Sequence, residues 1–292
     1  MSFWREVEAF LRSFALREGL TEEEFRFVER ELKRYAPKSF KGVHPVYGEP
    51  YHSTTTGPVA EALGKFLGPS RLLEKAKKYD ELTLLEVGFG LGHNAVITAA
   101  ELLKVNPRLR INYYALDLSP PPYREPLPPP YDGLQRKILS ALPEVELNGL
   151  RLKLITGDAR KTIKSLSIKA DAVFHDGFSP FRNPELWSLE FLALVKERLK
   201  DDGYWVSYSS SLAVRRALLE LGFKVGSGVK AGRKRPSTVA SLKGEVPPLE
   251  PEEKEKLLSS PYATPIRDPT LSAGPLELLA RYFLEVFKKG AR

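Results

Sequence analysis

The stretch that decides the fold of this chain is Leu82–Asn94, which reads LTLLEVGFGLGHN. Its first half is a short apolar run, as expected of a β-strand covered on both faces. Gly88, Gly90 and Gly92 then allow the backbone to turn sharply and to approach a ligand closely, because glycine has no Cβ. A helix beginning near His93 would point its unpaired N–H groups at this turn. The pattern predicts a nucleotide-type cofactor loop, and a tight turn without a ligand is the alternative.

Composition bounds the class of protein. The chain has 292 residues, no cysteine and four histidines, so we expect one large domain without disulfides, thiolate catalysis or a protein-bound metal. No apolar run is long enough to cross a membrane, and Glu6 and Glu8 interrupt the first apolar segment as a signal peptide would not. We therefore expect a cytoplasmic protein. Its 24 prolines, single methionine and many Lys, Arg and Glu residues are typical of a thermophilic source.

The net charge of +8 favours an anionic partner, nucleic acid first, although a basic surface without any partner is the alternative. The excess is concentrated in one place. Residues 1–40 hold eight basic and eight acidic side chains. Residues 224–243 hold no acid, and their six basic side chains are Lys224, Lys230, Arg233, Lys234, Arg235 and Lys243.

The order of the predicted elements indicates the architecture. Amphipathic helices are expected at 3–17 and 21–35, with Thr21 and Glu24 as a capping box, and a further helical pattern covers 59–78. Strands and helices then alternate, and two strands without an intervening helix end the series. The seven strands are expected near 82–88, 110–117, 150–156, 170–175, 203–208, 223–229 and 237–242.

This arrangement is an α/β fold with a mostly parallel, seven-stranded, Rossmann-like sheet whose last strand is antiparallel. It is typical of class I S-adenosylmethionine-dependent methyltransferases rather than of dehydrogenases, whose six strands are all parallel. We expect three parts: N-terminal helices and a cofactor-covering loop (1–80), the methyltransferase core (81–243), and a C-terminal linker and helix (244–292). A proline-dense insertion at 119–132 can be neither helix nor central strand, and a helix is expected at 183–199.

Acidic residues stand at the ends of three predicted strands, where ligands bind in such sheets. Glu86 lies in the motif Glu-x-Gly-x-Gly-x-Gly, Asp117 ends the second strand, and Asp158 precedes Ala159 at the end of the third. Carboxylates bind a ribose diol, and a carboxylate beside a backbone N–H suits adenine. For Asp158, a helix N-cap is an equally open interpretation.

Asp176 is the candidate catalytic residue. It follows the apolar strand ADAVFH and precedes Gly177 and Phe178. In amino-group methyltransferases this strand end commonly carries Asp-Pro-Pro-Tyr or a relative of it, in which the acid or amide orients the accepting nitrogen. Methyl transfer to nitrogen requires a neutral amine in line with the methyl group, and a carboxylate can receive the proton or steer the amine. The alternative is a turn residue.

Three segments carry a resemblance to a known family: DGFSPFRNPELWS (Asp176–Ser188), SLAVRRALLELGF (Ser211–Phe223) and GRKRP (Gly232–Pro236). Together with EPYHSTTTGPVAEA (Glu49–Ala62) and the glycine loop, they resemble the methyltransferase domain of MnmC-type tRNA 5-methylaminomethyl-2-thiouridine methyltransferases. The resemblance spans about residues 47–240. It implies S-adenosylmethionine-dependent methylation of 5-aminomethyl(-2-thio)uridine at the tRNA wobble position, with Asp176 as the catalytic residue. It also implies a cofactor site lined by Tyr51, Ser53, Glu86, Gly88, Gly90, Asp117, Asp158 and Ala159.

The best-known members of that family are fused to an FAD-dependent oxidase, whereas only about fifty residues follow the last predicted strand here. The chain therefore resembles the stand-alone methyltransferase, without FAD and without oxidase activity. His52 replaces an aromatic residue of the fused members, which leaves its role open.

The predicted basic turn supports tRNA as the partner that the resemblance implies. Lys230, Arg233, Lys234 and Arg235 lie between the last two strands, where they are expected to contact the phosphates of an anticodon stem-loop. Arg182 is also expected to bind the tRNA. An extruded base is expected to stack on Phe178 or Phe181, whereas Trp187 is more typical of a core residue. We expect a monomer. The alternatives are an aminopropyltransferase-like enzyme, which would have an acidic amine pocket, and a tRNA-binding protein with a vestigial cofactor site.

Overall fold

The computed structural model describes residues 3–34, 49–51, 56–230 and 236–290. Its centre is one sheet in the order β3-β4-β2-β1-β5-β6-β8-β7. Strands β4, β2, β1, β5 and β6 are parallel, and β8 runs antiparallel between β6 and β7. The strands are β1 (Glu81–Val87), β2 (Arg110–Asp117), β3 (Glu144–Leu147), β4 (Leu150–Thr156), β5 (Ala170–His175), β6 (Leu199–Ser207), β7 (Lys224–Ser227) and β8 (Thr238–Ser241). The mostly parallel sheet with a reversed last strand is confirmed.

The number of strands was wrong by one, because β3 adds an eighth strand antiparallel to β4 at the edge. It pairs through a two-residue turn at Asn148 and Gly149, whose φ angles are +42° and +86°. Asn-Gly is the commonest dipeptide of such hairpin turns. Only Val145 of the strand is buried, so its four residues carry too little apolar pattern to be recognised without that dipeptide.

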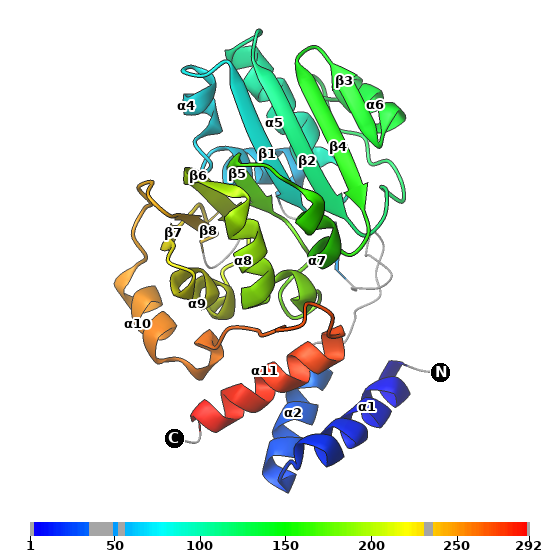
Figure 1. Ribbon diagram of the computed structural model, residues 1–292, viewed down its shortest axis with the longest axis vertical. Helices are drawn as coiled ribbons and strands as arrows, with labels where there is room; N and C mark the ends of the chain where they lie inside the picture. Colours follow the sequence, from blue (N-terminus) through cyan, green and yellow to red (C-terminus); the bar gives the residue numbers. More distant parts are fainter. Residues whose placement is uncertain (1–2, 35–48, 52–55, 231–235, 291–292) are drawn as a thin grey trace.

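Helices cover both faces of the sheet (Figure 1). One apolar layer includes α7, α8, α9 and α11, and the other includes α4, α5, α6 and a π-helical stretch at Ala62–Leu67. Successive side chains of β1 point to opposite faces of the sheet. Leu85 packs in the layer with α7, α8, α9 and α11, and Leu84 packs in the layer with α4, α5 and α6. The α-helices are α1 (Phe3–Glu18), α2 (Glu22–Arg34), α3 (Gly57–Glu61), α4 (Leu72–Ala76), α5 (His93–Val105), α6 (Asp132–Ala141), α7 (Ala159–Thr162), α8 (Leu189–Glu197), α9 (Leu212–Glu220), α10 (Pro251–Ser259) and α11 (Pro275–Gly290).

Two predicted helices are divided in the structure. The helical pattern at 59–78 becomes α3, the π-helix and α4, with a break at Arg71, whose φ is +56°. The predicted helix at 183–199 begins instead as a 3₁₀ turn at Pro184–Leu186, and Ser188 then caps α8 through its hydroxyl. A helix within the predicted linker, α10, was not foreseen.

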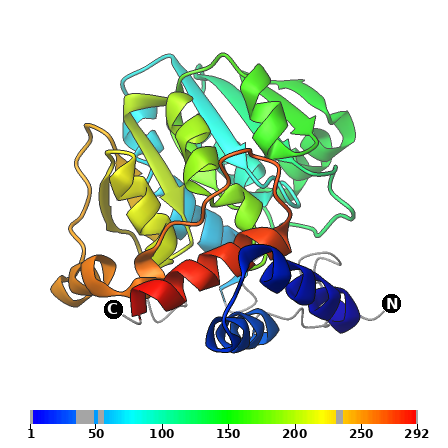
Figure 2. The same ribbon diagram turned by 60° about the horizontal axis from the view of Figure 1, so that its bottom comes forward.

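The N-terminal helices pack on the C-terminal one, as Figure 2 shows from below. The predicted capping box of α2 forms: the Thr21 N–H donates to Glu24 Oε2 at 2.8 Å, and the Glu24 N–H to Thr21 Oγ1 at 3.2 Å. Phe27 of α2 meets Phe287 of α11 at 5.3 Å between ring centroids, and Arg17 pairs with Glu277 at 2.7 Å. Within the described ranges, no helix is long and apolar enough to cross a membrane.

Candidate active site

A cavity of about 500 Å³ opens at the carboxyl ends of β1, β2, β4 and β5, where the strand order reverses on either side of β1. Its volume is in the range of small-molecule and cofactor sites. The predicted site residues that line it are Tyr51, Gly88, Gly90, Asp117, Asp158, Ala159, Asp176 and Phe178. Glu86, Phe181, Arg182 and Lys230 are not among its lining residues. Ser53, Arg233, Lys234 and Arg235, and His52 with them, lie outside the described residues.

The glycine loop leaves β1 with three residues at positive φ, Gly88, Gly90 and Gly92. A Cβ on Gly88 would lie 2.6 Å from the carbonyl oxygen of Asp176, so this glycine is required by the close approach of two strand ends. At Gly90 a Cβ would meet only the ring of Tyr51, at 3.5 Å, across the cavity. Of these two positions, only Gly90 leaves the backbone open to a ligand.

Asp117 is held against this loop. Its Oδ2 accepts a hydrogen bond from the Gly90 N–H at 2.8 Å, and its Oδ1 one from the Ser119 N–H at 3.3 Å. These contacts orient the carboxylate at the end of β2 while it lines the cavity. A carboxylate in this position can accept hydrogen bonds from a ligand's hydroxyl groups.

Asp158 acts as the N-cap of α7, the interpretation that was left open for it: its Oδ1 accepts from the Arg160 N–H at 3.0 Å. The guanidinium of Arg160 also binds this carboxylate, through Nη2 at 2.8 Å and Nε at 3.0 Å. Burial acts to raise the pKa of Asp158, but the hydrogen bonds from Arg160 outweigh it and the pKa lies below its ordinary value. The carboxylate still lines the cavity beside Ala159.

Glu86 is completely buried behind the glycine loop rather than in the cavity. Its Oε1 accepts from Asn94 Nδ2 at 3.0 Å, and its Oε2 from the Tyr113 hydroxyl at 2.9 Å. Burial raises the pKa of Glu86 to about 8 despite these two donors. Its position makes Glu86 a support for Asn94, which itself lines the cavity.

Asn94 joins Glu86 to Asp176. The same Nδ2 that binds Glu86 donates to Asp176 Oδ2 at 2.8 Å, using the second of its two hydrogens. Burial raises the pKa of Asp176 well above its ordinary value, and the charges of Glu61 and Glu86 raise it further, against the hydrogen bond from Asn94. Asn94 is the second residue of α5, two positions after the last glycine of the loop, and no sequence pattern assigned it a role.

Glu61 contributes another carboxylate to the cavity that sequence reasoning missed. It ends α3, and its Oε1 lies 2.7 Å from Nζ of Lys65, whose side chain is only 1% exposed. Lys65 belongs to the π-helix Ala62–Leu67, a wide helical turn that is frequent at functional sites. The detectable signal was the pair of charged residues four positions apart in an otherwise apolar helix.

Residues 49–51 also line the cavity. Glu49 accepts hydrogen bonds from the Ser179 N–H at 2.7 Å and from the Ser179 hydroxyl, so it anchors the loop after Asp176. Tyr51 meets Phe178 and Tyr123 edge-on, with ring centroids 5.7 Å apart in both pairs. Tyr123 comes from the proline-dense insertion and is 43% exposed. We call Tyr51, Phe178 and Tyr123 the aromatic rim.

The remaining predicted substrate residues lie elsewhere. The ring of Phe181 packs on Tyr282 and Phe283 of α11, at 5.4 and 5.7 Å, which ties that helix to the core. Trp187 is buried as expected, and its Nε1 donates to the Phe178 carbonyl at 2.7 Å. Arg182 and Lys230 lie in loops away from the cavity lining.

The cavity is acidic. Its carboxylate residues are Glu49, Glu61, Asp117, Asp158, Asp176 and Glu185, whereas Arg160 is the single lysine or arginine among the described residues that line it. Such a site favours cationic ligands, which include a sulfonium and an ammonium group. Acidity was expected of an aminopropyltransferase-like site, but it suits any enzyme whose substrate is an amine. In the part of the chain that the structure describes, no three His, Cys, Asp or Glu side chains are arranged to hold a metal ion.

These residues fit S-adenosylmethionine. Asp117 presents a carboxylate for a ribose diol, beside a glycine whose missing side chain leaves the backbone accessible. Asp158 and Ala159 offer a carboxylate and the first turn of a helix at the end of β4, the pair suited to an adenine edge. The acidic lining suits the sulfonium.

The comparisons with known proteins point to the same cofactor, S-adenosylmethionine. A family of S-adenosyl-L-methionine-dependent methyltransferases matches residues 132–243. The crystal structure of MnmC2 from Aquifex aeolicus is 47% identical in sequence and superposes with a TM-score of 0.92, over 97% of this chain and 99% of that one.

Longer relatives match part of their length. An uncharacterised protein of Methanocaldococcus jannaschii, MJ0670, is 31% identical over 74% of this chain and 61% of its own. The tRNA 5-methylaminomethyl-2-thiouridine biosynthesis bifunctional protein MnmC of Ralstonia nicotianae is 30% identical over 67% of this chain and 32% of its own. The chain therefore spans about three fifths of the first relative and about a third of the second.

Proposed function

This chain belongs to the family of MnmC2 from Aquifex aeolicus, and on that premise we propose that it is an S-adenosylmethionine-dependent tRNA methyltransferase. Its reaction would be N-methylation of 5-aminomethyl(-2-thio)uridine at the wobble position, giving 5-methylaminomethyl(-2-thio)uridine. The observation that carries the proposal is an acidic cavity at the strand ends, with Asp176 in its lining, in a chain that matches MnmC2 along nearly its whole length. The names of the bifunctional MnmC relatives supply the nucleoside.

The cofactor would be held at the β2 and β4 side of the cavity. Asp117 would bind the ribose hydroxyls, while Gly90 lets them approach the loop backbone. Asp158 and the N–H of Ala159 would read the adenine edge, and Tyr51 and Ser53 would cover the site from the segment before α3. When bound, the cofactor supplies a methyl group activated by attachment to a positively charged sulfur.

Asp176 would orient the amine and accept its proton. An aminomethyl group is largely protonated at neutral pH, and it must lose a proton to expose the nitrogen lone pair. A carboxylate with a raised pKa is a better proton acceptor than an ordinary one, because its pKa lies closer to the working pH. The Asn94 hydrogen bond to Oδ2 fixes the carboxylate, so Oδ1 would be the oxygen that meets the substrate.

The target base would enter between the rings of the aromatic rim. Tyr51 and Phe178 line the cavity, and Tyr123 contacts the ring of Tyr51. An unpaired base gains binding free energy by stacking on such rings. Tyr123 thus takes the place that Phe181 held among the sequence-based candidates. Aromatic contact and the acidic lining together suit a nucleobase that carries an ammonium group.

The anticodon stem-loop would lie along the basic turn between β7 and β8. In the sequence, Lys230, Arg233, Lys234 and Arg235 stand between these two strands, and Arg182 is a further candidate for phosphate contact. Replacing Arg233, Lys234 and Arg235 together by glutamine should weaken tRNA binding and reduce the slope of log K against log salt. An unchanged slope would exclude this turn from the interface. We further propose a monomeric enzyme that acts on cytoplasmic tRNA.

Transfer of a labelled methyl group tests the proposal. The protein is incubated with labelled S-adenosylmethionine and tRNA containing 5-aminomethyluridine, and the nucleosides are separated after digestion. Label is expected in 5-methylaminomethyluridine. Its absence there, while the protein binds the cofactor, would refute the proposed acceptor. Decarboxylated S-adenosylmethionine with a polyamine tests the aminopropyltransferase alternative in parallel, and product formed only in that arm would favour it.

A further inference from the structure

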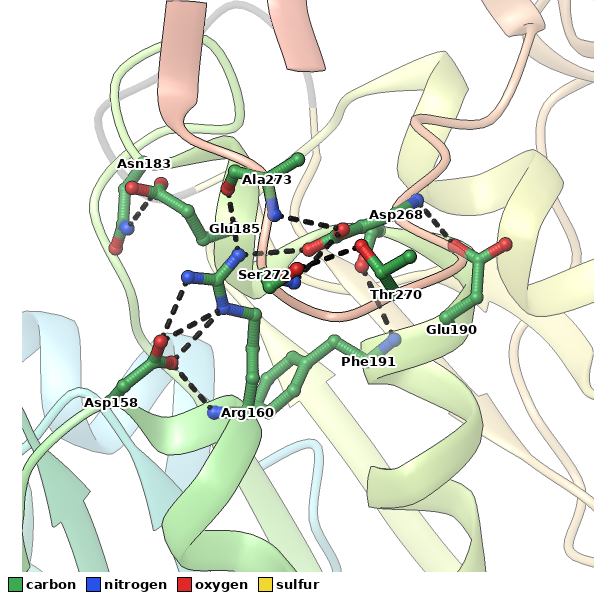
Figure 3. Close-up of polar contacts among 11 residues, drawn as sticks. Asp158, Arg160, Asn183, Glu185, Glu190, Phe191, Asp268, Thr270, Ser272 and Ala273 are labelled. Atoms are coloured by element: carbon green, nitrogen blue, oxygen red, sulfur yellow. Dashed lines mark hydrogen bonds and ion pairs between the residues drawn. The ribbon is translucent and has the colours of Figure 1, made fainter. Parts of the chain in front are cut away.

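The segment between α10 and α11 runs back past α7 and α8 before α11 begins (Figures 1 and 2). It carries Asp268, which is 0% exposed although it lies in a loop without regular structure. A buried carboxylate in a surface-type connection requires partners that compensate for the loss of water. Figure 3 shows that those partners lead directly to Asp158.

Arg160 links the two acids. Its Nη1 donates to Asp268 Oδ2 and to the carbonyl of Ala273, both at 2.8 Å, while Nη2 and Nε bind Asp158 (Figure 3). Arg160 itself is only 8% exposed. A guanidinium is planar and rigid, so fixing Nη1 on one side fixes the direction of Nε and Nη2 on the other. The C-terminal segment therefore sets the angle at which Arg160 meets Asp158.

Asp268 is in turn held from several sides. Its Oδ1 accepts from the N–H groups of Ser272 and Ala273, both at 3.2 Å. Its own N–H donates to Oε2 of Glu190, in the first turn of α8, at 2.6 Å. Both carboxylate oxygens of Asp268 are thus used, one to close its own loop and the other to hold Arg160.

Asp158 remains able to bind a ligand in this arrangement. It receives the Arg160 backbone N–H, Nε and Nη2, with Nε shared between its two oxygens at 3.0 and 3.2 Å. These are four hydrogen bonds, two on each oxygen, yet the side chain of Asp158 is still 30% exposed and lines the cavity, where a ligand's amino group can reach it. The direction in which the carboxylate faces the cavity depends on the direction of the guanidinium.

We propose that Asp268 is a positioning residue for cofactor recognition: through Arg160 it orients Asp158 toward the adenine amino group. The C-terminal segment is then part of the cofactor site, although it lies outside the sheet that forms the cavity. The inference rests on the proposed function only in taking an adenosyl cofactor as the ligand of Asp158.

Binding of S-adenosylhomocysteine, measured by calorimetry on the full-length protein, tests this role. Asp268→Asn has one oxygen where two are used, so it cannot both close the loop and hold Arg160. We expect its Kd to rise about tenfold, since hydrogen bonds to charged groups are the contacts affected. The matched control is Arg267→Gln. Arg267 is the neighbouring residue, and its side chain is 58% exposed. In the described part of the chain it pairs with Oε1 of Glu190 rather than with Asp268 or Arg160, so we expect an unchanged Kd.

A second readout separates positioning from general loss of structure. The wild type should prefer S-adenosylhomocysteine to its 6-oxo analogue, because a carboxylate accepts from an amino group and repels a carbonyl. Asp268→Asn should reduce this preference, and its effect should not add to that of Asp158→Asn in the double variant. Arg160→Lys, which keeps the charge and loses the fork, should act in the same direction if Asp268→Asn fails to fold.

The outcomes are distinct. If wild-type protein binds no S-adenosylhomocysteine, the proposed function fails. If the wild type binds it, and the folded variants show the same Kd and the same preference, only the role of Asp268 fails. A lower melting temperature with unchanged Kd and preference would also overturn that role, because it would leave Asp268 as a purely structural residue.

Discussion

The two ends of the cavity use the same residue type in opposite environments. At the cofactor end, Asp117 and Asp158 accept hydrogen bonds from backbone N–H groups and from a guanidinium, and the pKa of Asp158 is lowered by Arg160 against the effect of burial. At the acceptor end, Asp176 shares one amide with Glu86 and faces the charge of Glu61, and its pKa is raised by burial and by those charges.

In the proposed function, this difference in environment assigns cofactor binding to Asp117 and Asp158 and proton transfer to Asp176. A carboxylate that stays ionised at every working pH is suited to hold a neutral hydroxyl or amino group. A carboxylate whose ionisation is made unfavourable is suited to take a proton. Environments that push the pKa values of neighbouring acids apart are a general means of assigning different tasks to one side chain. Substitutions at each end should therefore have different signatures.

The largest effect is expected at Asp176. Asp176→Asn keeps the shape and the contact with Asn94 but cannot accept a proton. We expect kcat to fall by about 10²–10⁴, the usual contribution of a positioned proton acceptor, while the Kd for S-adenosylhomocysteine stays the same. Single-turnover methyl transfer and calorimetry measure the two quantities. A fall of less than about threefold in the rate would remove Asp176 from the chemistry and erase the contrast.

A smaller and opposite signature is expected at Asp117. Asp117→Asn replaces one carboxylate oxygen, which accepts hydrogen bonds, by an amide NH2 group, which donates them, at the predicted ribose site. We expect the Kd for S-adenosylhomocysteine to rise about 10–100-fold, in line with hydrogen bonds to a charged group, with kcat at saturating cofactor little changed. Calorimetry with steady-state rates tests this. Reduced kcat at unchanged Kd would mean that the two ends do not divide the tasks.

The third prediction concerns the charge of Glu61. Since that charge raises the pKa of Asp176, removing it should move the acidic limb of the kcat profile to lower pH. Glu61→Gln alone would remove the carboxylate that pairs with the buried Lys65 ammonium group. Breaking a buried ion pair in this way strongly destabilises the fold. The double variant Glu61→Gln/Lys65→Met avoids this problem and should still move the limb to lower pH, because the Glu61 charge raises the pKa of Asp176 more than the Lys65 charge lowers it. A limb that does not move in the folded double variant would show that Glu61 does not influence the proton acceptor.

The smallest effect is expected at Glu86, on stability rather than turnover. The pKa of this carboxyl is raised from 4.5 to about 8, so the native state favours its protonated form. That contribution is complete below about pH 4.5 and is lost as pH rises through 8. Glu86→Gln should therefore melt at a higher temperature than the wild type at pH 9, by about 2–4 °C per kcal/mol, and the difference should shrink toward pH 5. Equal melting temperatures of the two proteins at pH 9 would show that the fold does not raise the pKa of Glu86.

Local patterns predicted much of the frame. The apolar run of β1 followed by three glycines predicted a strand, a turn and a helix, and the capping box at Thr21 predicted the start of α2. The alternation of elements predicted the mostly parallel sheet and its reversed last strand. Because parallel strands end at one edge, that topology also brought Asp117, Asp158 and Asp176 into one cavity.

The amino-acid sequence by itself therefore determined the fold, the family resemblance and which strand ends form the site. Only the tertiary structure decided the environment of each acid there. The Glu49–Ser179 contact joins positions 130 residues apart, and the Arg160–Asp268 pair joins positions 108 apart. No local signal marks such pairs, because periodicity and turn chemistry act over a few residues whereas desolvation and charge depend on what the whole fold packs around a group. For that reason the sequence located the acids, and the packed structure alone distinguished the acids proposed to hold the cofactor from the one proposed to take a proton.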